Sequence, residues 1–214
     1  MEFARVLSLV GDEPVFETAL LFAGAPDLPY LQRQLSRWVK LGYLQQLRRG
    51  LYALAPPYQK TVPHPFLLAN RLVRASYVSC ESALSFHGLI PEYVPTTTSV
   101  TTQRPGQWTN AYGTFLYQHV KVALFFGYEL VQLDHKQQAF VATPEKALID
   151  LIHLRPAADS APYLQELRLQ QLDHLDLARL DQYVARAGGP KLLRAAEYIR
   201  ALVSIESAEY ETLR

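Results

Sequence analysis

The sequence contains a single cysteine, Cys80, among 214 residues, which excludes an internal disulfide framework. It also lacks any apolar run approaching the roughly 18 residues that a membrane-spanning helix requires. A chain that uses no disulfide suits a reducing compartment, so we expect a cytoplasmic protein that does not enter a membrane. Cys80 itself is interpreted as a small buried apolar residue and not as a nucleophile.

Acidic residues are absent from one long stretch, residues 28–80, which holds eight Lys and Arg side chains. The whole chain has 21 Lys and Arg against 20 Asp and Glu, so this basic charge is local. A positive surface on a nearly neutral protein suits a polyanion such as nucleic acid. The plainer alternative is a solvated surface that happens to be basic. Four later arginines, residues 179, 186, 194 and 200, lie among acidic residues and are interpreted as solvated helix faces.

Motifs for catalysis and cofactor binding are missing as well. The sequence contains no GxxxxGK[ST] or GxGxxG phosphate loop, and no HExxH, GxSxG or paired CxxC motif. No histidine stands at a convincing metal-ligand spacing. Glu145, Lys146 and Asp150 suggest a nuclease-like cluster, but Thr143-Pro144-Glu145 fits a helix start better. We therefore expect no catalytic residue, no metal and no cofactor, and a protein that is not an enzyme.

What the sequence does contain is a helix with two contrasting faces, beginning after Asp27. Apolar residues recur at helical spacing on one side, which predicts a stripe docked on a core. The stripe consists of Leu28, Leu31, Leu35, Trp38 and Val39. Basic side chains lie on the opposite side of the same helix. Asp27 is the expected N-cap, and Gly42 is a natural stop.

The segment that follows this helix predicts a hairpin with an arginine-rich turn. Residues 43–47 and 51–54 form its strands, and Arg48-Arg49-Gly50 forms its tip. Two shorter helices are expected earlier, over residues 2–10 and 16–23, with Ala19 and Leu20 inward in the second. Three helices followed by a hairpin predict a winged helix-turn-helix, whose recognition helix enters the major groove while the wing lies along the backbone.

The candidate DNA-binding residues lie on the helix and on the hairpin. Arginine suits guanine because its fork matches two acceptors, and glutamine can pair with adenine in the same way. A tyrosine near the helix start can contact a phosphate or a thymine methyl group, and arginines on the wing can neutralise phosphates. The residues predicted to bind DNA are Tyr30, Arg33, Gln34, Arg37, Lys40, Arg48 and Arg49.

The sequence predicts an α+β fold with two domains. Residues 1–55 form the winged helix-turn-helix, residues 56–65 a proline-rich linker, and residues 66–214 a mixed α/β domain. In the second domain we expect a small mixed or antiparallel sheet of four or five strands over about residues 96–142, with a polar loop at 103–110. Helices are expected over residues 144–204, followed by a frayed, charged end.

Five blocks of sequence, taken in order, resemble a known family. They are WVKLGYLQQLRRGLYAL, YVSCESALSFHGLIPE, TSVTT, GTFLYQHV and ATPEKALIDLIHL. The chain resembles the AbiEi-type antitoxins, from the type IV toxin–antitoxin systems of bacterial abortive infection, over most of residues 1–155. The Gly-Ser and Asp-x-Asp signature of the partner toxin is absent, so the resemblance is to the antitoxin.

The resemblance implies a double role for the protein. The first domain is expected to bind inverted repeats in its own promoter, in double-stranded DNA, and to repress the operon. The second domain is expected to counteract a nucleotidyltransferase-like toxin without forming a stable complex with it.

Two other functions remain open on the sequence alone. The first is a stand-alone winged-helix transcriptional regulator, whose C-terminal domain senses a ligand or dimerises. The second is an enzyme with its active site in the β-rich middle of the chain, which the lack of any convergent polar motif disfavours. The genes adjacent to this one would discriminate the antitoxin from the stand-alone regulator.

Overall fold

The structure of the chain, a computed structural model, describes residues 1–22 and 28–212. Its N-terminal part consists of short helices and a three-stranded sheet in the order β1-β3-β2. The elements are α1 (Phe3–Val10), β1 (Phe16–Glu17), α2 (Thr18–Phe22), α3 (Leu28–Lys40), β2 (Leu44–Arg48) and β3 (Leu51–Leu54). Helices followed by a hairpin were expected for a winged helix-turn-helix, and β1 adds a short third strand beside β3.

The C-terminal part contains a six-stranded mixed sheet and most of the helices. Its first half comprises α4 (Pro65–Leu72), β4 (Ser76–Val78), α5 (Cys80–Phe86), β5 (Thr96–Thr101), β6 (Gly106–Asn110) and β7 (Gly113–His119). Its second half comprises β8 (Tyr128–Gln132), β9 (Gln138–Ala142), α6 (Pro144–Leu154), α7 (Ala161–Glu166), α8 (Leu177–Ala187) and α9 (Pro190–Thr212). Short 3₁₀ turns lie at Val122–Leu124, Asp134–Lys136 and Leu172–His174. The α+β class predicted from the sequence is therefore confirmed.

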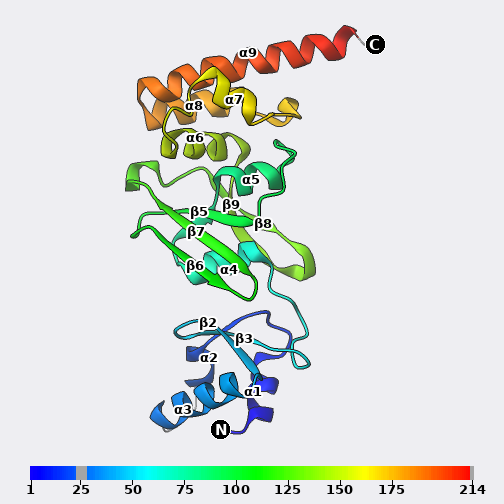
Figure 1. The fold of residues 1–214 in the computed structure, drawn as a ribbon, viewed down its shortest axis with the longest axis vertical. Coiled ribbons are helices and arrows are strands. Elements are labelled where there is room, and N and C mark those ends of the chain that lie inside the picture. Colours follow the sequence, from blue (N-terminus) through cyan, green and yellow to red (C-terminus); the bar gives the residue numbers. More distant parts are fainter. Residues whose placement is uncertain (23–27, 213–214) are drawn as a thin grey trace.

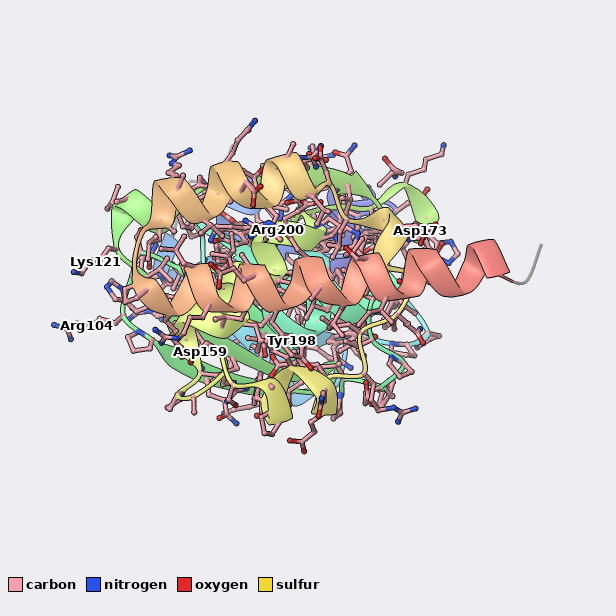
Figure 2. The ribbon with its side chains drawn as sticks, turned by 90° about the horizontal axis from the view of Figure 1, so that it is seen from above. Arg104, Lys121, Asp159, Asp173, Tyr198 and Arg200 are labelled. Atoms are coloured by element: carbon pink, nitrogen blue, oxygen red, sulfur yellow. The ribbon has the colours of Figure 1, made fainter. Side chains whose placement is uncertain are left out.

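The six strands run in the order β6-β7-β5-β4-β9-β8, which places the early strand β4 in the middle of the sheet. β5 pairs in parallel with β7, and β4 pairs in parallel with β9 through Val78 and Val141. Figure 1 shows α5 and α6 on the side of the sheet away from α1–α3, with α7–α9 forming a further layer. Figure 2 shows α9 lying across this end of the molecule between α7 and α8.

Two hydrophobic cores meet at the β2–β3 hairpin. Tyr52 and Leu54 pack into the core of the N-terminal helices, while Leu51 and Ala53 belong to the core of the C-terminal part. This alternation follows from the strand period of two, which sends successive side chains to opposite faces. All four residues of β3 are buried, so this strand is enclosed on both faces. In Figure 1 it lies between α1–α3 and the large sheet.

Several local predictions were wrong. Residues 16–23 were expected to form one helix, but Phe16 and Glu17 pair with β3, and the helix begins at Thr18. Ala19 and Leu20 are exposed, and Leu21 is the buried residue of this helix. The expected N-cap, Asp27, lies outside the described residues.

The predicted sheet and helical tail also differ from the observed ones. The polar loop expected at 103–110 contains strand β6, because Gly106–Asn110 folds back on β7 as a hairpin and the ring of Trp108 packs edge-on against Tyr117. The sheet has six strands, one more than the largest number expected, and extends back to Ser76. The final helix continues to Thr212, beyond the predicted end at residue 204.

A buried polar cluster connects α6 to the sheet. Asp150 accepts hydrogen bonds from the hydroxyls of Tyr77 (2.9 Å) and Ser79 (2.7 Å) and forms an ion pair with Lys146. Lys146 is fully buried, and its ammonium lies 4.9 Å from the centroid of the Phe126 ring. Burial raises the pKa of Asp150, and the nearby Lys146 opposes that rise.

The start of α6 has the cap that the sequence predicted at Thr143. The helix-cap interpretation is confirmed, because the Thr143 side chain accepts a hydrogen bond from the Lys146 backbone N–H. The sequence did not reveal that Glu145, Lys146 and Asp150 would all be buried. Lys146 and Asp150 join α6 to β4, while Glu145 accepts a hydrogen bond from the backbone N–H of Asp176 before α8.

Candidate nucleic-acid interface

The two faces of α3 separate largely as the sequence predicted, with Val39 half-buried and the side chain of Leu28 outside the described residues. Leu31, Leu35 and Trp38 are buried in the N-terminal core. Arg33, Arg37 and Lys40 are exposed and follow one another at spacings of four and three residues, which places them on one side of the helix. The helix therefore has an apolar side that fixes its position and a basic side that faces solvent. We call Arg33, Arg37 and Lys40 the basic face.

The charges of the basic face are not neutralised by a carboxylate of the described residues. Within the described ranges 1–22 and 28–212, Arg33, Arg37 and Lys40 form no ion pair. Arg37 and Lys40 also lie in the last turn of α3, where the helix dipole favours cations. Arg33 lies earlier in the helix, so the dipole does not account for it. The three charges are available to an external anion.

The arginines of the two C-terminal helices α8 and α9 have internal partners. Arg194 pairs with Asp159 at 2.6 Å, Arg179 approaches Glu145 at 3.7 Å, and Arg200 pairs with Asp181. The Arg186 guanidinium lies 3.9 Å from the centroid of the Phe126 ring. These four arginines therefore lie on their own helix faces with internal partners, unlike the basic face of α3. Arg71, Arg104 and Lys136 resemble the basic face in forming no ion pair among the described residues.

The remaining predicted residues of α3 lie beside the basic face. Tyr30 is 41% exposed near the helix start, where its ring can reach a ligand on the same side. Gln34 is half-buried, so its amide lies at the border between the two faces. In Figure 1, α3 lies at the end of the molecule opposite α9, and its outer side is not covered by the C-terminal part.

The two arginines of the hairpin differ in their surroundings. Arg49 is exposed at the turn, whereas Arg48 is half-buried and its Nε atom has no hydrogen-bond partner among the described residues. The charge of Arg48 helps to lower the pKa of Glu17 and partly opposes the rise that burial causes in the pKa of Tyr117. Arg48 therefore lies near the junction between the two parts of the chain, and Arg49 alone occupies the solvent-facing tip.

The turn of the hairpin is fixed by Gly50. Its φ of +83° is the left-handed region, and a Cβ there would lie 3.2 Å from Oγ1 of Thr18. Thr18 donates two hydrogen bonds to the Gly50 carbonyl, each 3.0 Å long, from its backbone N–H and from its hydroxyl. The start of α2 therefore holds the turn in place, and with it the position of Arg49.

The basic stretch 28–80 does not form one continuous positive surface. Lys60 pairs with Asp12 at 2.9 Å, and Arg74 pairs with Glu17. Both acids belong to the N-terminal segment that carries most of the early negative charge. The positive charge available to an anion is therefore concentrated on α3 and at the hairpin tip, with Arg71 further away on α4.

No group of three or more His, Cys, Asp or Glu side chains among the described residues is arranged to hold a metal ion. In the same part of the chain, no helix is both long and apolar enough to cross a membrane. A scan against models of known protein families finds no match, and a search of curated proteins finds none either.

Proposed function

We propose that this chain is a bacterial antitoxin of the AbiEi type that binds the promoter of its own operon and represses it. The observation that carries the DNA-binding half is the basic face of α3, held outward by its buried apolar stripe. A helix of this kind at the end of a helix-turn-helix can lie in the major groove and reach base edges. Arg33 and Arg37 are its guanine readers, Gln34 its adenine reader, and Lys40 and Arg49 contact phosphates.

The antitoxin half rests on the sequence resemblance alone. In this proposal the C-terminal part counteracts a nucleotidyltransferase-like toxin in the cytoplasm without forming a stable complex with it. The protein performs no catalytic step, and its ligand is double-stranded DNA containing inverted repeats.

A stand-alone regulator is the second candidate, and one observation favours it. A cleft of about 1180 Å³ lies between the end of α1 and the C-terminal sheet. An interdomain cleft is a common place for a small-molecule site, and a ligand there could alter how the DNA-binding part is held. In this candidate the repressor half is unchanged and the toxin is absent.

The DNA-binding half is tested with the full chain and the duplex immediately upstream of its gene. We expect fluorescence anisotropy to show tighter binding to this duplex than to a shuffled duplex of the same length, by about a thousandfold or more. Arg37→Ala is expected to weaken specific binding by about 1–3 kcal/mol. The matched control is Arg104→Ala, an exposed arginine of the C-terminal part that Figure 2 shows at the periphery. Equal affinity for both duplexes would exclude sequence-specific repression by this chain.

The antitoxin half is tested separately, by expressing the neighbouring gene alone and together with this chain. Growth arrest that co-expression relieves is the expected result. If the neighbouring gene encodes no nucleotidyltransferase-like protein, or if growth arrest persists on co-expression, the antitoxin hypothesis is rejected in favour of the stand-alone regulator.

A further inference from the structure

The interdomain cleft has walls from both parts of the chain. Residues 9–15, at the end of α1 and in the turn after it, form one wall. The other wall is formed by α4 and the segment after it, by β8 and β9, and by the turn between these two strands. Small-molecule sites usually enclose roughly 300–1,000 Å³. At about 1180 Å³ this cleft is large enough for a ligand of nucleotide size.

One part of the cleft is an exposed apolar surface. Leu130 and Phe140 are directly opposed across the antiparallel pair of β8 and β9, so their side chains share a face. Leu130 is 53% exposed and Phe140 is 43% exposed. Tyr128 packs edge-on against the Phe140 ring, with centroids 5.7 Å apart. A ligand with an apolar body would remove this surface from water, which is favourable in proportion to the area covered.

Two cations on the same wall supply charge. Arg71, in the last turn of α4, and Lys136, in the β8–β9 turn, are both exposed and line the cleft. Neither side chain makes a hydrogen bond or an ion pair within the part of the chain that the structure describes. By contrast, the nearby Arg74 is held by Glu17. Of the two acids on the facing wall, Asp12 is held by Lys60, while Glu13 forms no ion pair among the described residues. The open charges on the α4 side are therefore positive.

The backbone around these cations adopts an uncommon conformation. His135 and Lys136 have consecutive φ values of +54° and +59°, and Ala75, which also lines the cleft, has a φ of +56°. Residues other than glycine seldom occupy this left-handed region, and such positions gather at ligand-binding sites. In the β8–β9 turn this conformation determines where Lys136 is presented.

We propose that the cleft binds an anionic organic molecule with an apolar body. The anionic group lies near Arg71 and Lys136, and the body covers Leu130 and Phe140. Because the opposite wall belongs to the N-terminal part, a ligand that contacts both walls stabilises the arrangement in which α3 is held. Ligand binding does not require the DNA-binding function proposed above, and the test below contains no DNA.

The test uses 8-anilinonaphthalene-1-sulfonate, an aromatic anion, titrated into the full chain and followed by fluorescence. We expect saturable binding that Arg71→Ala and Lys136→Ala each weaken about tenfold, because a charge-assisted contact is lost. Leu130→Ser is expected to weaken binding similarly, and as an exposed residue it can be replaced without opening the core. The uncharged analogue N-phenyl-1-naphthylamine should respond to Leu130→Ser but not to Arg71→Ala.

The control variants are Arg104→Ala, a cation outside the cleft, and Tyr93→Ala, an exposed aromatic residue on a second hollow. Both should bind the probe as the unmodified chain does. A second readout locates the probe: bound probe should slow the acetylation of Lys136 and leave that of the exposed Lys121 unchanged. The proposal is overturned by non-saturable fluorescence, by unchanged affinity in all three cleft variants, or by loss of binding in Tyr93→Ala.

Discussion

Arg74, which follows α4, forms an ion pair with Glu17 of β1 and so connects the two parts of the chain directly. Hydrogen bonding by Arg74 lowers the pKa of Glu17, and the charges of Arg71 and Arg48 add to that effect. Glu17 belongs to the strand that pairs with β3, and Thr18 beside it holds the Gly50 turn. The pair therefore supports the hairpin from the side of the C-terminal part.

We expect the contribution of Glu17 to stability to depend on pH. The folded-state pKa of Glu17 is lowered. Its contribution to stability is therefore present above the unfolded-state pKa of about 4.5 and is lost as pH falls through the folded-state pKa. Urea unfolding of Glu17→Gln should show a small loss of stability near pH 7 that disappears in acid. A loss of the same size at both pH values would contradict the role of this ionised carboxylate. The exposed Glu129→Gln is the control.

Gly50 and Gly42 form a matched pair for testing the hairpin turn. Both have positive φ, but a Cβ would approach Thr18 Oγ1 only at Gly50, while at Gly42 no atom lies within 4 Å. We expect Gly42→Ala to cost about 1–2 kcal/mol from the backbone conformation. Gly50→Ala should cost a further ~1 kcal/mol, because the Thr18 contact must shift. Thermal unfolding of the two variants provides the comparison, and equal losses would mean that the Thr18 contact does not restrain the turn.

The buried ion pair of α6 should be costly to break. Lys146→Met leaves Asp150 without its cation, which typically costs about 3–5 kcal/mol. Burial raises the pKa of Asp150, and the charge and hydrogen bond of Lys146 oppose that rise. Both opposing effects are lost in Lys146→Met. A folded-state pKa above the unfolded value means that protonation favours the folded state, so this variant should recover stability as pH falls from neutral through the folded-state pKa of Asp150. Denaturant unfolding at several pH values measures this, and a deficit that does not shrink would contradict the assignment.

Arg48 and Arg49 are adjacent in the sequence, yet we expect them to act differently. Arg49→Ala should reduce the slope of log affinity against log salt by about one unit, because one phosphate contact is lost. Arg48→Ala should change stability instead, since Arg48 is half-buried near Glu17 and Tyr117. DNA titrations across a salt series, paired with denaturant unfolding, separate the two effects. A slope that falls for Arg48→Ala and not for Arg49→Ala would reverse the assignment.

The sequence predicted the elements whose pattern repeats along the chain. Leu31, Leu35 and Trp38 were identified because a docked helix buries residues at helical spacing, and the basic residues of α3 follow from the same period. The Thr143 cap and the final helix were likewise recognisable from local signals, apart from the position where that helix ends.

The features that the sequence did not reveal depend on distant partners. Strand β6 is polar, and it forms because β7 lies beside it. Lys146 and Asp150 look like surface residues in the sequence, because the hydroxyls that bind Asp150 belong to Tyr77 and Ser79, 73 and 71 positions earlier. The burial of β3 has the same origin, because Leu51 and Ala53 pack into the core of the C-terminal part.

The central claim is that the basic face of α3 is the nucleic-acid interface, and lysine acetylation of the full chain tests it most directly. Lys40 lies on that face, while Lys121 is an exposed lysine of the C-terminal part that Figure 2 shows at the periphery. Mass spectrometry after brief acetylation, with and without the upstream duplex, reports the protection of each lysine. The account predicts that the duplex slows labelling of Lys40 and leaves Lys121 unchanged. Equal labelling of Lys40 in both samples, or protection of Lys121 instead, would contradict it.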